Sequence, residues 1–240
     1  MAETKIEWTE STWNPSTGCT KISSGCVNCY AERMAKRLKA MGTPKYAKGF
    51  KVTLHEDCLS EPYSWKKPKV IFVNSMSDLF HEEIPFEFIE KVFKVMNENP
   101  QHIFQVLTKR AELLLEYSPK LNWTSNIWMG VTVEDFKAKR RIDYLRQTGA
   151  AIKFLSCEPL LSDLGCLNLE NINWVIVGGE SGPKSRPIEE DWVIDIYKQC
   201  KTNDIPFFFK QWGGVNKKKS GKELQGEVYQ EMPEKIEDWI

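Results

Sequence analysis

The sequence contains no long hydrophobic run. No apolar stretch approaches the ~20 residues that a membrane-spanning helix needs, and the first eight residues lack the apolar core of a secretory signal. We therefore expect a protein of the reducing cytoplasm, without a membrane partner.

The chain also lacks net charge, because 33 Lys and Arg residues balance 33 Asp and Glu residues. No overall field would draw nucleic acid or an anionic membrane toward the molecule. A local basic patch is still compatible with this balance. The run 137–141 falls on an expected helix, and we interpret it as a solvated face.

A third absence concerns the cysteines, since the group Cys19, Cys26 and Cys29 has no fourth cysteine beside it. A structural zinc ion needs four ligands, which only a distant residue such as Cys58 or His55 would complete. Three thiolates are sufficient for a [4Fe–4S] cluster that leaves one iron open to a small molecule. We therefore favour an iron–sulfur site, with zinc as the alternative.

Short apolar runs alternate with helical patterns along the 240 residues. Expected strands lie at 5–9, 70–73, 103–107, 127–131, 152–155, 174–177 and 207–209. Expected helices lie at 85–97, 111–117, 133–147 and 189–201. This alternation predicts an α/β fold, a partial or complete (β/α) barrel related to the TIM barrel, with six to seven mainly parallel strands. The barrel would cover 1–214, with the cysteine loop at 18–30 and an appended segment at 215–240.

Small and acidic residues follow nearly every expected strand. In a parallel barrel, the carboxyl ends of the strands form the active-site face, and we place the cysteine loop on the same rim. The segments that follow the strands are 74–78, 108–110, 132–134, 156–159 and 178–182.

These segments, with residues 13–32 and 209–214, resemble a bacteriophage and prophage family described as radical-SAM-like. Its members occur beside a "three-Cys-motif partner" protein, so the resemblance implies such a partner and a bacterial or phage-infected host cell. One departure is visible. Six residues separate Cys19 from Cys26 where the usual signature has three, and Asn28 occupies its aromatic position.

The resemblance implies a radical S-adenosylmethionine enzyme. Cys19, Cys26 and Cys29 would hold a [4Fe–4S] cluster, and S-adenosylmethionine would chelate the fourth iron. An electron donor would then drive formation of a 5′-deoxyadenosyl radical. The substrate would be a nucleic acid, a nucleobase or a partner protein, and no catalytic side chain is identified.

The resemblance also implies where the cofactor binds. Asp78, helped by Ser75 and Ser77, would bind its ammonium group. Lys109 or Arg110 would bind its carboxylate, with Arg110 favoured because a guanidinium binds a carboxylate bidentately. Three glycines would allow close approach of adenosine, and three glutamates would bind ribose hydroxyls or substrate. These are Gly178, Gly179 and Gly182, and Glu134, Glu158 and Glu180.

Two other classes of function are compatible with the same residues. Asp78 and the three glutamates could converge on Mg²⁺ or Mn²⁺ in a metal-dependent hydrolase or nuclease. The cysteines could instead stabilise a zinc module that binds nucleic acid or protein.

Overall fold

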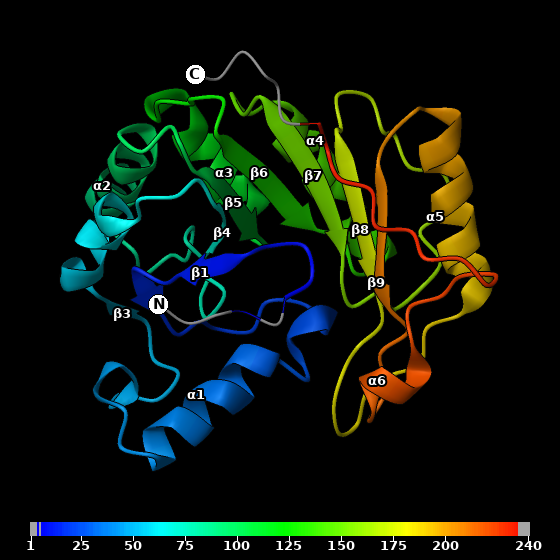
Figure 1. Ribbon diagram of the computed structural model, residues 1–240, viewed down its shortest axis with the longest axis horizontal. Coiled ribbons are helices and arrows are strands. Elements are labelled where there is room, and N and C mark those ends of the chain that lie inside the picture. The colour runs from blue at the N-terminus through cyan, green and yellow to red at the C-terminus, as the bar shows by residue number, and fades with distance from the viewer. Residues whose placement is uncertain (1–3, 5, 235–240) are drawn as a thin grey trace.

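A computed structural model describes residues 4 and 6–234, without the side chains of residues 217 and 218. Seven parallel strands form one curved sheet with the order β1-β4-β5-β6-β7-β8-β9, which leaves β1 and β9 as open edges (Figure 1). The strands are β1 (Ser11–Trp13), β4 (Val70–Val73), β5 (Ile103–Thr108), β6 (Ile127–Thr132), β7 (Ile152–Cys157), β8 (Trp174–Gly178) and β9 (Phe207–Gln211). The fold is therefore the partial form of the expected barrel.

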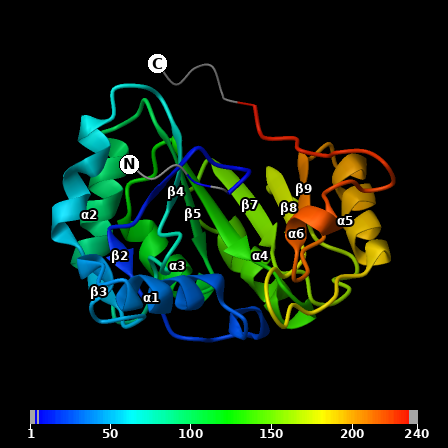
Figure 2. The same cartoon turned by 60° about the horizontal axis from the view of Figure 1, so that its bottom comes forward.

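Helices cover the convex face of this sheet. The four outer helices are α2 (Phe86–Asn97), α3 (Ala111–Tyr117), α4 (Arg140–Arg146) and α5 (Glu190–Thr202), whereas α1 (Tyr30–Ala40) and the short α6 (Lys217–Ser220) lie near the carboxyl ends of the strands (Figures 1 and 2). Across the described residues, none of the helices has both the length and the apolar composition needed to cross a membrane.

Side-chain alternation along the strands gives the sheet two different faces. On the convex face, residues such as Val106, Met129 and Val175 pack with the outer helices in the main core. On the concave face, Trp128, Phe154 and others form a second, aromatic cluster near the amino ends of the strands. The concave face is therefore closed by apolar side chains at one end, which leaves its other end for polar residues.

Trp8 completes this aromatic cluster from outside the sheet. Its ring lies 4.7 Å from that of Phe72 and 6.3 Å from that of Trp174, and only 3% of the residue is exposed. Its carbonyl accepts a hydrogen bond from Gln105 in β5. The segment before β1 thus lies across the concave face and plugs its floor.

The first strand differs from the expectation. Residues 7 and 8 form a turn, Lys5 lies outside the described residues, and the strand begins at Ser11 instead. The apolar residues at 6 and 8 face the barrel floor, which explains why they imitate a strand. A two-stranded pair that we did not expect, β2 (Ser16–Thr17) with β3 (Thr53–Leu54), follows β1.

The helix expected at 133–147 is shorter and begins with a 3-10 turn. That turn, η5 (Phe136–Lys139), follows Asp135, whose carboxylate accepts a hydrogen bond from the backbone N–H of Ala138. The α-helix α4 starts only at Arg140. The other expected helices agree with the structure within a residue or two.

The described part of the appended segment, up to residue 234, lies along the outer edge of β9. The N–H of Phe209 bonds to the carbonyl of Tyr229, and the indole of Trp174 donates to the carbonyl of Glu231. This segment therefore covers a sheet edge and does not form a separate core.

Candidate functional site

The cysteine loop lies over the carboxyl ends of the strands, and the chain enters it through a fixed point. The N–H of Gly18 bonds to the carbonyl of Met76 after β4, and the N–H of Cys19 bonds to the carbonyl of Phe50. Gly18 has a φ of 88°, and a Cβ there would lie 2.2 Å from the carbonyl oxygen of Lys51. Only glycine fits this position. After Cys29, the chain turns directly into α1.

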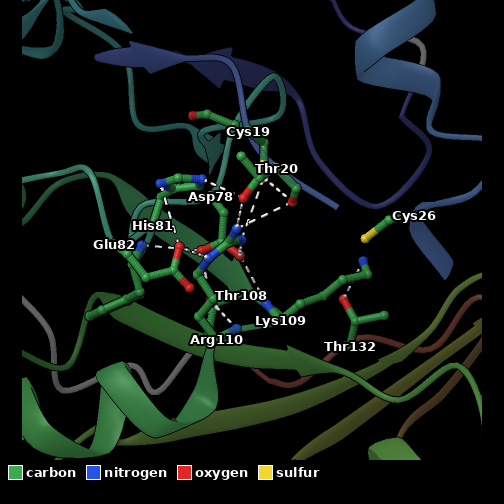
Figure 3. A network of polar contacts seen from close by, with 12 residues as sticks. Cys19, Thr20, Cys26, Asp78, His81, Glu82, Thr108, Lys109, Arg110 and Thr132 are labelled. Atoms are coloured by element: carbon green, nitrogen blue, oxygen red, sulfur yellow. Dashed lines mark hydrogen bonds and ion pairs between the residues drawn. The ribbon is translucent and has the colours of Figure 1, made fainter. Parts of the chain in front are cut away.

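Arg110 anchors the first cysteine. This side chain is only 3% exposed, and its Nη1 donates to Cys19 Sγ at 3.4 Å and to Asp78 Oδ2 at 3.2 Å (Figure 3). Its Nη2 donates to both oxygens of Thr20, and its Nε donates to Glu82. One buried guanidinium therefore connects the cysteine loop with the ends of β4 and β5.

Asp78 holds that guanidinium in position. Its Oδ1 accepts from Thr108 Oγ1 at 2.7 Å and from the N–H of Phe80, and its Oδ2 also accepts from the N–H of Lys109. Both carboxylate oxygens are thus engaged within the protein, and the residue is 6% exposed. This geometry gives Asp78 a structural partner in Arg110, while its expected contact with the ammonium group of a cofactor stays a prediction.

The thiols of Cys19 and Cys26 experience different electrostatic environments. Burial and the charge of Asp78 raise the pKa of Cys19 to about 11, although Arg110 opposes the shift. Burial also disfavours the Cys26 thiolate, but nearby Lys109 and hydrogen bonds from Ile22 and Ser23 outweigh it, so the pKa of Cys26 is lowered. Lys109 lies beside Cys26, and its Nζ donates to Thr132 Oγ1 at 3.2 Å (Figure 3).

The middle of the loop rests on the end of β6. Ser24 donates to the carboxylate of Asp135, and a Cβ at Gly25 would lie 3.2 Å from the side chain of Glu134. Glu134 is fully buried; its Oε2 accepts from Arg141 at 2.6 Å, and its Oε1 has no protein partner among the described residues. The loop therefore covers a buried ion pair.

The end of the loop is bound to the segment after β8. The side-chain amide of Asn28 donates to Glu180 Oε2 and to the carbonyl of Lys184, each at 2.9 Å. Arg186 forms a bidentate pair with the same carboxylate. Burial tends to raise the pKa of Glu180, but the hydrogen bonds from Arg186 and Asn28 outweigh this effect and bring the pKa to about 2.

Each acidic residue expected at this rim has its own cationic partner. The four pairs are Asp78 with Arg110, Glu134 with Arg141, Glu158 with Lys210, and Glu180 with Arg186. The carboxylates are therefore distributed around the rim and neutralised, not gathered on one cation. This arrangement does not support the divalent-metal hydrolase.

No group of three Cys, His, Asp or Glu side chains within the described ranges is arranged to hold a single metal ion. A cubane cluster binds each thiolate through a different iron, so its ligands surround a volume and do not converge on a point. Cys19, Cys26 and Cys29 are free, partly exposed thiols on one loop. Three thiolates are the donor set that such a cluster needs, and binding of a cluster by these three stays a proposal.

The two distant zinc ligands are engaged elsewhere. Cys58 is buried, and its Sγ accepts a hydrogen bond from Lys45 at 3.0 Å. His55 Nε2 is hydrogen bonded to Thr17 at 2.8 Å. Neither side chain completes a tetrahedral set with the loop cysteines.

The serines after β4 connect two backbone segments. Ser77 Oγ donates to the carbonyl of Ser16, and Ser75 Oγ donates to the side chain of Asn14. These contacts attach the β1–β2 turn to the end of β4. They give Ser75 and Ser77 a structural role, while their expected contact with a cofactor stays a prediction.

The glycines after β8 are explained by protein atoms. A Cβ at Gly178 would lie 2.7 Å from Glu158 Oε1, one at Gly179 would lie 2.0 Å from the carbonyl oxygen of Trp212, and one at Gly182 would meet the guanidinium of Arg33. Close packing inside the protein therefore accounts for all three positions. Their contact with adenosine stays a prediction.

Several partners at this rim were missed from the sequence. Arg141 belongs to the run 137–141 that we interpreted as solvated, yet it is 8% exposed and paired with Glu134. Its spacing of seven residues from Glu134, two helical turns, is the one signal that could have revealed it. Lys210 and Asn28 have no such local signal, because the fold alone brings their partners close. Arg186 lies near Glu180 in the sequence, but in an irregular segment where no helix or strand period predicts which side chains meet.

A family model described as "Protein of unknown function (DUF5131)" matches residues 3–233. The chain belongs to this family. No curated protein matches it significantly.

Two solved structures of spore photoproduct lyase are similar to this DUF5131 protein. One is a double mutant with bound AdoMet and dinucleoside spore photoproduct, and the other is complexed with dinucleoside spore photoproduct; their TM-scores are 0.46 and 0.47. In both comparisons the identity is 10%, and the match covers 82% of this chain but 62% of the lyase chain. The chain thus spans less than two thirds of the lyase.

Proposed function

We propose that this protein is a radical S-adenosylmethionine enzyme whose cluster is held by Cys19, Cys26 and Cys29. The observation that supports this most is the position of three free, partly exposed thiols on one loop, fixed at both ends and in the middle over the carboxyl edge of a parallel sheet. This edge is where barrel enzymes place their chemistry. When bound and reduced, a [4Fe–4S] cluster with S-adenosylmethionine would supply a 5′-deoxyadenosyl radical.

In this proposal Lys109 binds the carboxylate of the cofactor. Its Nζ lies beside Cys26 and, within the described residues, pairs with no carboxylate of the protein. Arg110, in contrast, already contacts Asp78, Glu82 and the cysteine loop. We therefore assign cofactor binding to Lys109, and the positioning of Cys19 to Arg110 and Asp78.

The concave face would keep water from the reaction. Its floor is the aromatic cluster that contains Trp128 and Phe154 and that Trp8 completes. Near its polar end, Glu158 retains 14% side-chain exposure beside Lys210. Its contact with ribose hydroxyls or substrate stays part of the proposal. The apolar floor would keep water and other hydrogen donors away from a reactive radical, which such donors would quench.

The test is release of 5′-deoxyadenosine by anaerobically reconstituted protein with dithionite and S-adenosylmethionine. We expect Cys19→Ala, Cys26→Ala and Cys29→Ala each to abolish release, and Cys166→Ala, an exposed thiol outside the loop, to leave it unchanged. We expect Lys109→Met to retain the cluster but to bind the cofactor at least tenfold more weakly, a loss of about 1.4 kcal/mol. Release by the triple cysteine variant would contradict the proposal.

A further inference from the structure

Two surface hollows meet at Arg140, next to the cysteine loop. The larger has a volume of about 670 Å³ and is lined by Phe136, Lys137 and Cys166, among others. The smaller, about 230 Å³, is lined by Ile22 of the loop and by Lys109. Arg140 lines both. Because both hollows share Arg140 in their lining, we call the two together the Arg140 path.

The lining of this path is basic on a molecule without net charge. It contains six cationic residues and three acidic ones, and two of the cations, Arg110 and Arg141, are neutralised by Asp78 and Glu134 outside the lining, which leaves a local excess of one positive charge. The cations are Lys109, Arg110, Lys137, Lys139, Arg140 and Arg141, and the acids are Glu82, Glu112 and Asp143. Such a concentration of charge attracts anionic ligands locally even where the whole protein does not.

Several of these cations bind other groups of the protein, so only the remaining ones are available to a ligand. Arg141 is paired with buried Glu134, Arg110 holds the cysteine loop, and Lys139 donates to the carbonyls of Leu164 and Cys166 at 2.7 Å. Arg140 forms only an exposed pair with Glu112 at 3.3 Å, with 72% of its own side chain exposed. Lys137 is exposed as well. These two cations are therefore available to a ligand.

An exposed aromatic ring lines the same hollow as these two cations. Phe136 is 66% exposed, and Lys139 Nζ lies 4.9 Å from the centre of its ring. No part of the protein core explains this ring, because residue 136 lies outside every apolar cluster. Aromatic rings interleaved with cations are the features that bind single-stranded nucleic acids, through base stacking and phosphate contacts.

We propose that the Arg140 path binds single-stranded nucleic acid. Lys137 and Arg140 contact successive phosphates, a base stacks on Phe136, and the strand continues toward Ile22 and the cysteine loop. A single strand suits this path better than a duplex because it exposes base faces to the ring. The role of this strand as substrate rests on the proposed function, but its binding does not require a cluster.

The test is fluorescence anisotropy with labelled single-stranded DNA and RNA of about twelve nucleotides, and with the matching duplex. We use the full chain as purified, before any cluster reconstitution. We expect Phe136→Ala to weaken binding roughly tenfold. We expect Lys137→Ala with Arg140→Ala to lower the slope of log K against log salt by about 1.4, since each single-strand phosphate contact contributes about 0.7.

The control is the double variant Lys66→Ala and Lys67→Ala, which removes two exposed lysines just before β4, at the opposite end of the strands. It should leave affinity for the single strand unchanged. An equal loss in this control, tighter binding of the duplex, or no binding of either single strand would overturn the inference.

Cys166 provides a second readout from the native chain, because it is an exposed thiol within the larger hollow. A bound strand should slow its alkylation by N-ethylmaleimide at least threefold, resolved by peptide mass spectrometry, and Phe136→Ala should remove this protection. An unprotected Cys166 under saturating strand would contradict the site. Failure to bind a strand by protein that still takes up a cluster would reject the path alone, whereas strand binding by protein that cannot be reconstituted with a cluster would reject the proposed function alone.

Discussion

At the scale of single residues, Arg110 carries the most contacts at the site. Its positive charge neutralises the negative charge of Asp78 in a region where both side chains are nearly inaccessible to water. A buried charge without a partner strongly destabilises the folded state. Removal of one partner therefore lowers the stability by more than the ion pair itself contributes. The stability of this rim and the position of Cys19 therefore depend on the same side chain.

We expect Arg110→Met to lower the free energy of unfolding by about 3 kcal/mol, because it leaves Asp78 buried without its cation. Urea unfolding measures this change. Arg37→Met, at an exposed position of α1, should stay within about 0.5 kcal/mol of the parent protein. Adding Asp78→Asn to Arg110→Met should restore part of the loss. Equal stability of the Arg110 and Arg37 variants would disprove this role.

Glu180 gives the rim a predictable response to acid. Burial raises its pKa, but the bonds from Arg186 and Asn28 prevail and lower the pKa from 4.5 to about 2. Ionised Glu180 therefore stabilises the fold above pH 4.5, and this contribution disappears as the pH falls toward 2. Its size is at most about 3 kcal/mol.

The measurement compares the parent protein with Glu180→Gln by urea unfolding at several pH values. The stability difference should be largest near pH 7 and should shrink steadily below about pH 4.5. Glu170→Gln, at an exposed position, should show no comparable difference. A difference that does not change with pH would mean that Glu180 acts through packing and not through its charge.

At the scale of elements, the ends of β8 and β9 approach each other too closely for a side chain. A methyl group at Gly179 would collide with the backbone carbonyl of Trp212, which cannot move without the strand. One at Gly178 would meet only the end of the Glu158 side chain. The fold should therefore tolerate an added methyl group at residue 178 better than at residue 179.

We expect Gly179→Ala to destabilise the protein by about 3 kcal/mol and Gly178→Ala by about 1 kcal/mol, because strain falls on backbone in one case and on a flexible side chain in the other. Thermal and urea unfolding would measure both. The reverse order would show that the β8–β9 contact is described incorrectly.

The elements were more predictable from the sequence than the contacts between them. Buried parallel strands are runs of apolar residues, which located six strands, and their polar ends located the rim. The segment around Trp8 imitated a strand because it too buries alternate side chains. The partner of Glu158 could not be found, since Lys210 reaches it only through the folded chain. The partner of Glu180, Arg186, was missed because it follows in an irregular segment without a helix or strand period.

At the scale of the whole molecule, the sheet is open, and a later segment of the chain covers one of its edges. The edge of β9 is covered by the segment around Tyr229 and Glu231. Exposed strand edges pair readily with other chains. We therefore expect a chain that ends at Lys222 to associate in a concentration-dependent manner.

Size-exclusion chromatography with light scattering tests this expectation. The full chain and the point variant Lys201→Ala, which removes the ion pair with Glu231 and a contact with the Tyr197 ring but leaves the covering segment in the chain, serve as controls and should elute alike. A shortened chain that elutes as the full chain does at all concentrations would show that this edge needs no cover.

The function proposed for this protein depends on the group that the cysteine loop binds. Metal analysis of protein prepared without oxygen identifies this group most directly. We predict a brown protein with about four irons and four sulfides per chain, whose reduced paramagnetic resonance spectrum changes when S-adenosylmethionine is added. Cys26→Ala should lose the iron, whereas Cys166→Ala should retain it. A colourless protein that retains one zinc per chain and never takes up iron would contradict the account.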